Sequence, residues 1–460
     1  PSPSSSSSSF LTMSTTSSPT GSSPLGGSSP SRAEDITWHL PALWQPLEIF
    51  FLPHPQYHEV SAPCIANLFY GSGPLKKSER HFVALMTAAH HECQFLIDLH
   101  EREFEREGGE FHWLSGLKHM QNPCEKKYHT LDRFVHLISH QPWRVNGPVL
   151  QSVIREEDDV HWSINQLVHA ATIVAVTNAL CAMVHGLGKI EPMTATPHEL
   201  SRRSTRAEWN AKELRKNHCQ NKEVDYLIKR MATLRQIRRD NGEETGGEED
   251  EMAPPATPTE DIMAPFFSLT DGDENDSQDA HVNIFTAQPA LAYRDFAARD
   301  DPAKTYKIHE FDWDVAYNIL ADVDPISATL FDKRFELMQT LTYNTMGNYS
   351  NIDTSEYRLA IWNYIHALFG IRHDDYEYNK VNELLSRQMK TFIKTCVCYP
   401  ERMTEELRNH VMPDFTSSER IHALLIIIEA RCQANLLYFS RALNNYYVLQ
   451  AEDHKERRRR

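Results

Sequence analysis

A cysteine and a histidine seven residues apart are the first residues in this sequence that could do chemistry. Cys93 and His100 lie in the stretch 78–109, which has the apolar spacing of one long helix, with Ser78 as the expected N-cap and Gly108 as the expected stop. A thiol attacks only as the thiolate, and burial in an apolar stripe raises its pKa. Seven residues correspond to about 10.5 Å of rise, so a straight helix keeps the two groups apart. A plain core cysteine is the alternative interpretation.

A second group of residues, in the C-terminal half, has the chemistry of a pocket for a free amino acid. Arg358 lies in the first turn of a helix expected at 354–370, where the helix dipole disfavours a cation. An arginine there, on an apolar face, indicates an anionic partner such as a carboxylate. Glu419, in the first turn of a helix expected at 416–448, could bind an ammonium group. Apolar walls between these two charges would suit an aliphatic side chain.

Two hydroxyls extend the same pattern. Thr342 and Thr345 continue the apolar stripe of a helix expected at 326–345, so they would lie beside the pocket. Each of these residues also has a structural interpretation: Glu419 completes a capping box that begins at Thr416, threonine hydroxyls often bond to preceding carbonyls, and the arginine could form an ion pair with that carboxylate. The residues alone leave both interpretations open.

Composition excludes several classes of function. A net charge of -16 over 460 residues, with no strongly basic domain, argues against a nucleic-acid-binding protein. We find no run of about 18 apolar residues and no basic-then-apolar leader, so we predict neither membrane insertion nor a signal peptide. The 8 cysteines are scattered, which suits a reducing cytoplasmic or nuclear compartment. Histidines near His90 lack CxxC or HExxH spacing, so we predict no metal site and no cofactor.

The elements that must position these residues are helices, and we find no convincing strand pairs, so the predicted class is all-α. Further helices are expected at 128–140, 146–156, 160–186, 374–395 and 400–411, with a capping box at Asp374-Asp375-Tyr376-Glu377. The expected organisation is a disordered Ser/Pro-rich tail (1–34), an N-terminal helical domain (35–190), a disordered acidic linker with one short helix near Val224 to Leu234 (191–292), a C-terminal helical domain (293–449) and a charged tail (450–460).

Several long segments resemble the sestrins, stress-inducible regulators of target-of-rapamycin signalling. The resemblance is carried by HHECQFLIDLH (90–100), HWSINQLVHA (161–170), DTSEYRLAIWNYIHALFGIRHDDYEY (353–378) and SERIHALLIIIEAR (418–431). It implies a fold similar to the bacterial alkylhydroperoxidase D family, with two related helical domains joined by a long linker.

The resemblance implies a redox site in the N-terminal half. The family pattern is Cys-x-Tyr-x4-His, in which a hydroperoxide oxidises the cysteine while the tyrosine and histidine relay a proton. Cys93 and His100 match this pattern as catalytic residues, but Phe95 stands at the tyrosine position. A phenyl ring cannot pass a proton, so the relay is incomplete. A thiol-dependent alkylhydroperoxide reductase is therefore the alternative function that the resemblance implies.

In the C-terminal half the resemblance implies a sensor of L-leucine. An arginine would hold the leucine carboxylate, a glutamate its ammonium group, and three threonines would close over it. These positions fall on Arg358, Glu419, Thr342, Thr345 and Thr354. The family's pocket tryptophan is replaced by Met412, with Pro413 and Phe415 nearby, and methionine is apolar and adaptable enough to keep a pocket.

The resemblance also implies a protein partner, the GATOR2 complex. Its binding residues would be Asp374 and Asp375, with Tyr343 near them. The preferred function is an intracellular regulator that binds and inhibits GATOR2 when leucine-free, and so lowers the activity of target-of-rapamycin complex 1. A helical scaffold with neither ligand nor turnover is a third alternative.

Overall fold

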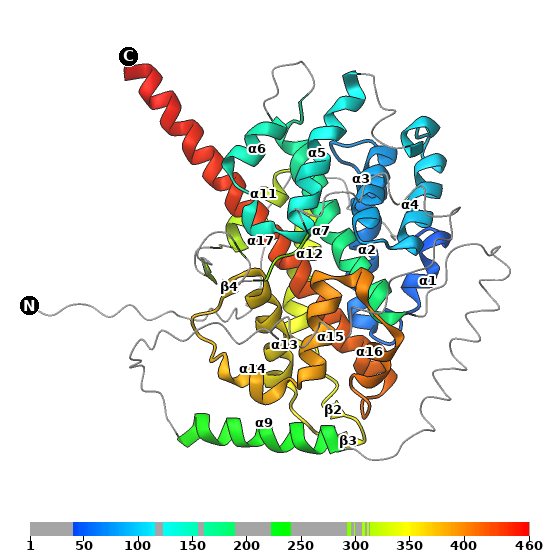
Figure 1. The fold of residues 1–460 in the computed structure, drawn as a ribbon, viewed down its shortest axis with the longest axis vertical. Helices are drawn as coiled ribbons and strands as arrows, with labels where there is room; N and C mark the ends of the chain where they lie inside the picture. Colours follow the sequence, from blue (N-terminus) through cyan, green and yellow to red (C-terminus); the bar gives the residue numbers. More distant parts are fainter. Residues whose placement is uncertain are drawn as a thin grey trace, which may run out of the picture. The chain divides into compact units, whose positions relative to one another are not determined.

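The computed structural model describes residues 40–115, 123–154, 161–188, 222–240, 292–295, 299, 306–308, 311 and 313–459. Within these ranges the protein is built mainly from α-helices (Figure 1), which confirms the all-α prediction. The predicted tail 1–34 and most of the predicted linker 191–292 lie outside the described residues, and the division into two domains stays a prediction.

The described helices fall before and after a central helix, α9 (Lys222–Asp240). Those before it are α1 (Gln45–Glu48), α2 (Pro55–Tyr70), α3 (Lys77–His90), α4 (Gln94–Arg106), α5 (Pro123–His140), α6 (Gly147–Ile154) and α7 (Ile164–Leu187). Those after it are α11 (Trp313–Ala321), α12 (Pro325–Thr340), α13 (Ser355–Phe369), α14 (Asn379–Leu384), α15 (Arg387–Cys398), α16 (Glu405–His410) and α17 (Ser417–Arg459). Short 3-10 turns cover Ala42–Trp44, Phe111–Ser115, Pro142–Arg144 and Pro400–Arg402.

Two small strand pairs accompany the helices, although the sequence predicted none. β1 (Tyr306–Lys307) pairs in parallel with β4 (Ile371–Arg372), with Tyr306 opposite Ile371. β2 (Thr345–Met346) and β3 (Tyr349–Ser350) form an antiparallel hairpin, with Met346 opposite Tyr349. At two residues each, these strands were too short to show a period-2 pattern in the sequence.

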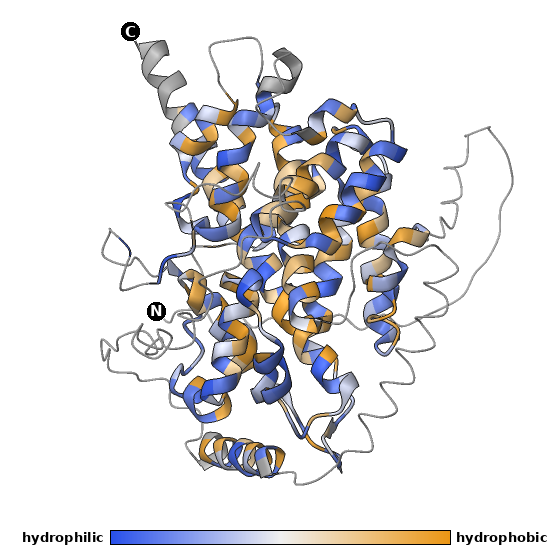
Figure 2. Cartoon of the chain, turned by 45° about the vertical axis from the view of Figure 1, so that its right-hand side comes forward, coloured by the Kyte–Doolittle hydropathy of each residue, from blue (hydrophilic) through white to orange (hydrophobic). Residues whose placement is uncertain are grey.

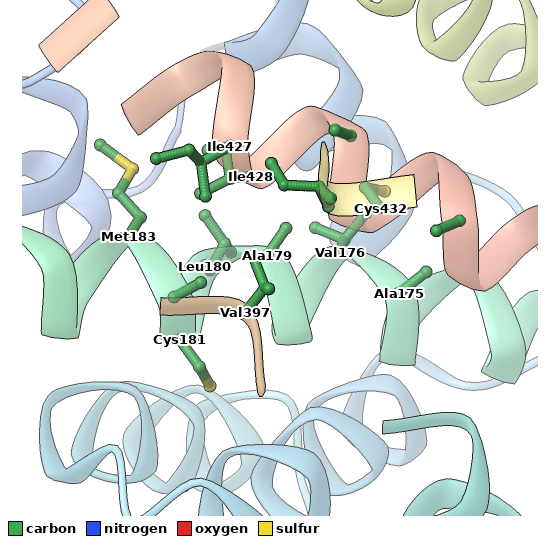
Figure 3. Packing of buried hydrophobic residues seen from close by; sticks show 14 of the residues in the cluster. Ala175, Val176, Ala179, Leu180, Cys181, Met183, Val397, Ile427, Ile428 and Cys432 are labelled. Carbon is green, nitrogen blue, oxygen red and sulfur yellow. The ribbon is translucent and has the colours of Figure 1, made fainter. Parts of the chain in front are cut away.

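The core is organised around α7 and α17. Every residue of α7 from Leu167 to Val184 is buried, as its lack of a polar face predicted. Gly188, at φ 60°, ends this helix in the left-handed conformation that glycine adopts without strain. In Figure 3, Ile427 and Ile428 of α17 face Ala179 of α7, whose small side chain lets the two helices approach closely. Figure 2 shows apolar positions along the central helices, and the packing of α7 against α17 joins the two halves of the described chain.

Two described helices are long and apolar enough to cross a membrane, which the sequence analysis did not expect. They are α7 and the part of α17 at Ser417–Val448. Their apolar windows are 100% and 94% buried against other helices, as in the core of a soluble protein. Length and composition therefore do not indicate a span here, and the absence of membrane insertion stays a prediction.

The helix expected at 78–109 is in fact two helices, α3 and α4, so the prediction of one uninterrupted helix is wrong. The chain reverses at Glu92, which has φ 48°, and Cys93 donates its N–H to the carbonyl of Ala88 at 3.0 Å. The expected N-cap is also wrong, because α3 begins at Lys77 after the cap residue Lys76 rather than after Ser78. The apolar stripe runs through the break because α3 and α4 pack against each other and bury their facing sides.

Other helix boundaries also differ from the predictions: α5 begins at Pro123, the helix expected at 400–411 is a 3-10 turn followed by α16, and α17 continues through the predicted charged tail to Arg459. The helix expected at 326–345 ends at Thr340, because Leu341 takes an extended conformation with ψ 125° and leads into the β2–β3 hairpin. The helix expected at 374–395 is replaced by α14 and α15. The capping box proposed at Asp374 is wrong, since pairing of β4 with β1 delivers the chain in an extended conformation and the next helix begins only at Asn379.

Candidate functional site

A pocket opens between the β2–β3 hairpin, the first turns of α13 and the start of α17. The empty space between these side chains is about 440 Å³, a figure that includes open solvent. Its lining consists of Tyr343, Thr345, Met346, Thr354, Tyr357, Arg358, Ile361, Phe415, Glu419, His422, Ala423 and Ile426. Apolar and aromatic side chains dominate this lining, and one cation and one carboxylate face it.

The cation is Arg358, which is buried and only partly satisfied. Its Nη1 donates to the Thr354 hydroxyl at 2.6 Å and its Nη2 to the carbonyl of Gln339 at 3.2 Å. Its Nε has no hydrogen-bond partner among the described residues. Burial lowers the pKa of Arg358 from its ordinary value, opposed by the nearby carboxylate of Asp353. A buried guanidinium with a free donor favours an anionic ligand.

The carboxylate of Glu419 does two things. Its Oε2 accepts the N–H of Thr416 at 2.9 Å, completing the predicted capping box, and also the N–H of Gly347 at 3.0 Å. Its Oε1 has no partner within the described ranges. The structural interpretation is therefore confirmed for one oxygen, while the other remains available to a ligand. Both charged residues are described and no ion pair joins them, so the alternative of an Arg358–Glu419 pair is wrong.

Three other predicted pocket residues lie in different places. Thr345 and Thr354 line the pocket, but Thr345 is in β2 rather than on the expected helix, and Thr354 is the N-cap residue of α13. Thr342 is not part of the lining in the described chain, and its hydroxyl accepts the N–H of Asn344 at 3.1 Å. Met412 is buried but does not line the pocket either, whereas Phe415 provides the aromatic wall.

Tyr343 lines one side of the pocket, and its hydroxyl bonds to His54, a residue far away in the sequence. Its hydroxyl lies 2.9 Å from Nδ1 of His54, and Nε2 of His54 lies 3.0 Å from the carbonyl of Ser418. A carbonyl can only accept, so Nε2 of His54 carries the proton and Nδ1 accepts from the tyrosine. The His422 ring is tilted against that of His54 and edge-on to that of Tyr343, and burial lowers the pKa of His422 to about 3, so it is neutral.

The predicted partner residues are not all in one place. Asp374 and Asp375 are exposed in the turn between β4 and α14, and Asp374 lies 3.8 Å from the ammonium group of Lys307. Tyr343 lines the pocket instead. The two aspartates form an exposed acidic turn, while the tyrosine hydroxyl is bonded to His54.

The predicted redox pair is not joined in the structure. His100 is buried, lies 3.1 Å from His81 through their Nδ1 atoms, and burial lowers its pKa to about 3. Cys93 stands at the N-cap position of α4 and is a free thiol. Its side-chain hydrogen-bond partners are Cys181 and His185 of α7. Cys93 is the N-cap of α4 and His100 lies about two turns further along the same helix, and Phe95 between them in sequence is buried and has no polar group.

Cys93 has the electrostatics of a reactive thiol. Burial raises its pKa, but hydrogen bonds from Cys181 and His185 outweigh burial and lower the pKa to about 6. The same interaction with Cys93 raises the pKa of His185, against the effect of burial. A thiolate at a helix N-terminus beside an imidazolium is a recognised way to stabilise the charged form. No group of three or more metal-ligating side chains occurs in the part of the chain that was described.

Comparison with known proteins decides the family. The family model described as PA26 p53-induced protein (sestrin) matches residues 38–447. The chain belongs to the sestrin family. It is similar to Sestrin-2 of Bos taurus, 32% identical over 412 residues that cover 85% of this chain and 83% of the relative. It is similar to Sestrin-3 of Mus musculus at 32% over 85% and 83% of the two chains, and to Sestrin-1 of Macaca fascicularis at 32% over 85% and 81%.

In this sestrin, sequence reasoning missed His422, which lines the pocket, and His54, which bonds to the lining residue Tyr343. His54 is 289 positions from its partner Tyr343, and His422 follows Glu419 by less than one turn of α17. A histidine three residues after a candidate ligand-binding carboxylate was a signal that the helical period could have used. His54 gave none, since only the fold brings it to the pocket.

Proposed function

We propose that this sestrin binds L-leucine between Arg358 and Glu419, and that its leucine-free form binds and inhibits the GATOR2 complex, lowering the activity of target-of-rapamycin complex 1 in the cytoplasm or nucleus. The observation that supports this best is a pair of unpartnered polar atoms in one pocket. Arg358 Nε needs an acceptor and Glu419 Oε1 needs a donor. A zwitterionic amino acid supplies both, while Met346, Ile361 and Ile426 offer apolar contacts to an aliphatic side chain.

The regulatory part of the proposal follows from linkage. Leucine can release a partner only if it binds more tightly to the released state than to the bound state. The hairpin that carries Thr345 and the turn that carries Phe415 both line the pocket. We expect these segments to differ between the two states.

The first experiment is a thermal melt of the purified chain with and without leucine. A ligand at 100 times its Kd stabilises the folded state by about 2.7 kcal/mol, so the melting temperature should rise. Arg358→Gln and Glu419→Gln should abolish the rise, and Arg387→Gln, on the exposed start of α15, should retain it. A parent protein whose melting temperature does not move at millimolar leucine would refute leucine binding.

The second experiment addresses the partner. Charge reversal by Asp374→Lys and Asp375→Lys should eliminate co-purification of GATOR2, because both side chains are exposed in one turn. Leucine stabilisation of the double variant should match the parent, since neither residue lines the pocket. Retained GATOR2 binding in that variant would refute the assignment of this turn.

A second candidate function is favoured by the environment of Cys93, whose pKa is lowered to about 6. The thiolate would attack the peroxide oxygen of an organic hydroperoxide, forming a sulfenate and releasing the alcohol after protonation. The residue placed to donate that proton is His185 rather than His100. Hydroperoxide turnover should disappear in Cys93→Ser and fall in His185→Gln, while His100→Gln should keep it; equal rates in Cys93→Ser and parent would exclude the activity.

A further inference from the structure

Helix α9 is attached to the body of the protein along one side. It comes from the central part of the chain, and yet its inward row Val224, Leu227, Met231 and Leu234 is buried, with exposed fractions of 0%, 3%, 1% and 7%. This spacing of three and four residues makes one apolar stripe. In Figure 1, α9 lies beside the β2–β3 hairpin and α14. Helix α9 contacts the segments that enclose the pocket.

The first contact is with the tip of the β2–β3 hairpin. Gly347 adopts φ +59°, and a Cβ built on it would lie 3.3 Å from Cγ2 of Val224. The N–H of Gly347 donates to Oε2 of Glu419 at 3.0 Å. Val224 therefore packs on the peptide that holds the pocket carboxylate in place.

The second contact is with the turn before α17. The N–H of Glu223 donates to Oδ2 of Asp414 at 2.9 Å. Asp414 is buried and directly precedes Phe415, the aromatic wall of the pocket. Its backbone carbonyl also lies 2.9 Å from the position of a Cβ on Gly347, so the hairpin tip, this turn and α9 meet at one place.

The third contact is with the loop before α13. Nη2 of Arg235 lies 3.1 Å from Oδ2 of Asp353 and also donates to the backbone carbonyl of the same residue. The next residue, Thr354, accepts from Nη1 of Arg358 at 2.6 Å. A fourth contact, between Arg230 and Glu383 of α14 at 2.8 Å, fixes the middle of α9.

We propose that α9 is a strap that holds the walls of the pocket in place, and that Glu223, Val224 and Arg235 are positioning residues for the ligand although none of them lines the pocket. Val224 contacts Gly347, whose N–H bonds to Glu419. Arg235 pairs with Asp353, and the next residue, Thr354, bonds to Arg358. This inference rests on the proposed leucine site. By linkage, the factor by which docked α9 raises leucine affinity is the factor by which leucine favours docking of α9. Events in the central part of the chain can thereby regulate the pocket.

The test uses the full chain with three substitutions. Val224→Asp places a charge in the buried row, Arg235→Gln removes the surface anchor without disturbing the core, and Ala232→Asp puts the same charge on the exposed face of α9 as a matched control. Backbone hydrogen exchange of residues 345–350 and 412–415 is measured without ligand, and leucine affinity is measured by calorimetry. Val224→Asp should speed exchange in both segments and weaken leucine binding at least about fivefold. Arg235→Gln should weaken it less, and Ala232→Asp should change neither quantity.

The outcomes separate the two proposals. Exchange and leucine affinity that stay at the parent values in both Val224→Asp and Arg235→Gln would overturn the strap. In the parent, leucine should slow exchange of the α9 amides 223–237; leucine binding without this slowing would also overturn it. If no variant and no parent binds leucine, but Val224→Asp still speeds exchange of residues 345–350, the ligand is wrong and the strap is supported.

Discussion

Breaking the buried ion pair between Arg334 and Glu429 should lower the free energy of unfolding strongly. The two side chains are 3% and 0% exposed, and Nη2 of the arginine lies 2.5 Å from Oε1 of the glutamate. The arginine Nε donates to the same oxygen at 3.1 Å, and the hydroxyl of Tyr57 donates to it at 2.5 Å. Three donors from α2 and α12 thus converge on one carboxylate oxygen of α17.

Glu429→Leu leaves the Arg334 guanidinium buried without a counter-charge. Removing one partner of a buried pair typically costs about 3–5 kcal/mol, and the unpaired hydroxyl of Tyr57 adds about 1–3 kcal/mol. The double variant Arg334→Met with Glu429→Leu removes both charges and should recover most of the loss, since apolar replacement of a buried pair is often neutral. What remains should be the hydroxyl cost alone, and adding Tyr57→Phe should remove it.

The assay is urea unfolding of the parent, the single variant, the double variant and the triple variant, followed by far-UV circular dichroism. The expected order of unfolding free energy places Glu429→Leu lowest, by at least about 3 kcal/mol below the parent. A double variant no more stable than Glu429→Leu would refute the reasoning, because it would mean that the uncompensated charge is not the source of the loss.

Three further predictions concern stability and the pocket. Burial lowers the pKa of His91 and His140, and that of His136 to about 3, so the unfolded chain takes up protons first as the pH falls below 6.5. Stability should therefore decline from about pH 6.5 downward, by about 1.4 kcal/mol per histidine at pH 5.5, and melting curves at pH 7.5 and 5.5 of the parent and His136→Gln test this. Ile428→Ala, between α7 and α17, should cost about 2–5 kcal/mol in urea unfolding, and a cost below about 1 kcal/mol would contradict the packing described. Gly347→Ala should weaken leucine binding, because φ +59° costs about 1–2 kcal/mol for a residue with a Cβ and that atom would lie 2.9 Å from the Asp414 carbonyl; unchanged calorimetric affinity would argue against this.

Long periodic segments were predictable and reversals were not. The apolar periods of α7 and α17 identified both helices, and the first-turn positions of Arg358 and Glu419 identified the charged pocket residues by a local argument about helix termini. The reversal at Glu92 was invisible, because two helices that pack against each other continue one stripe across it. Local periodicity reports which side of a segment is buried, but it does not report what buries it.

The predicted pocket threonines show the same limit of local periodicity. Spacing extended the α12 stripe through Thr345, whereas the chain leaves the helix at Leu341 and returns Thr345 to the pocket in a strand. Thr345 was correctly predicted to lie beside the pocket, but it was assigned to the wrong element. Sequence separation explains the contacts that were missed, since the hydrogen bond between His54 and Tyr343 spans 289 positions and leaves no trace in either segment.

Helix α17 connects the pocket with a second group of buried polar side chains further along its length. Glu419 lies in its first turn at the pocket, and twelve residues later Nη2 of Arg431 lies 3.1 Å from Nε2 of His91, which precedes Cys93 by two positions. Twelve residues of α-helix span about 18 Å, and a buried helix moves as one body. A displacement of the first turn of α17 at the pocket should therefore also shift Arg431 and His91, which Arg431 contacts.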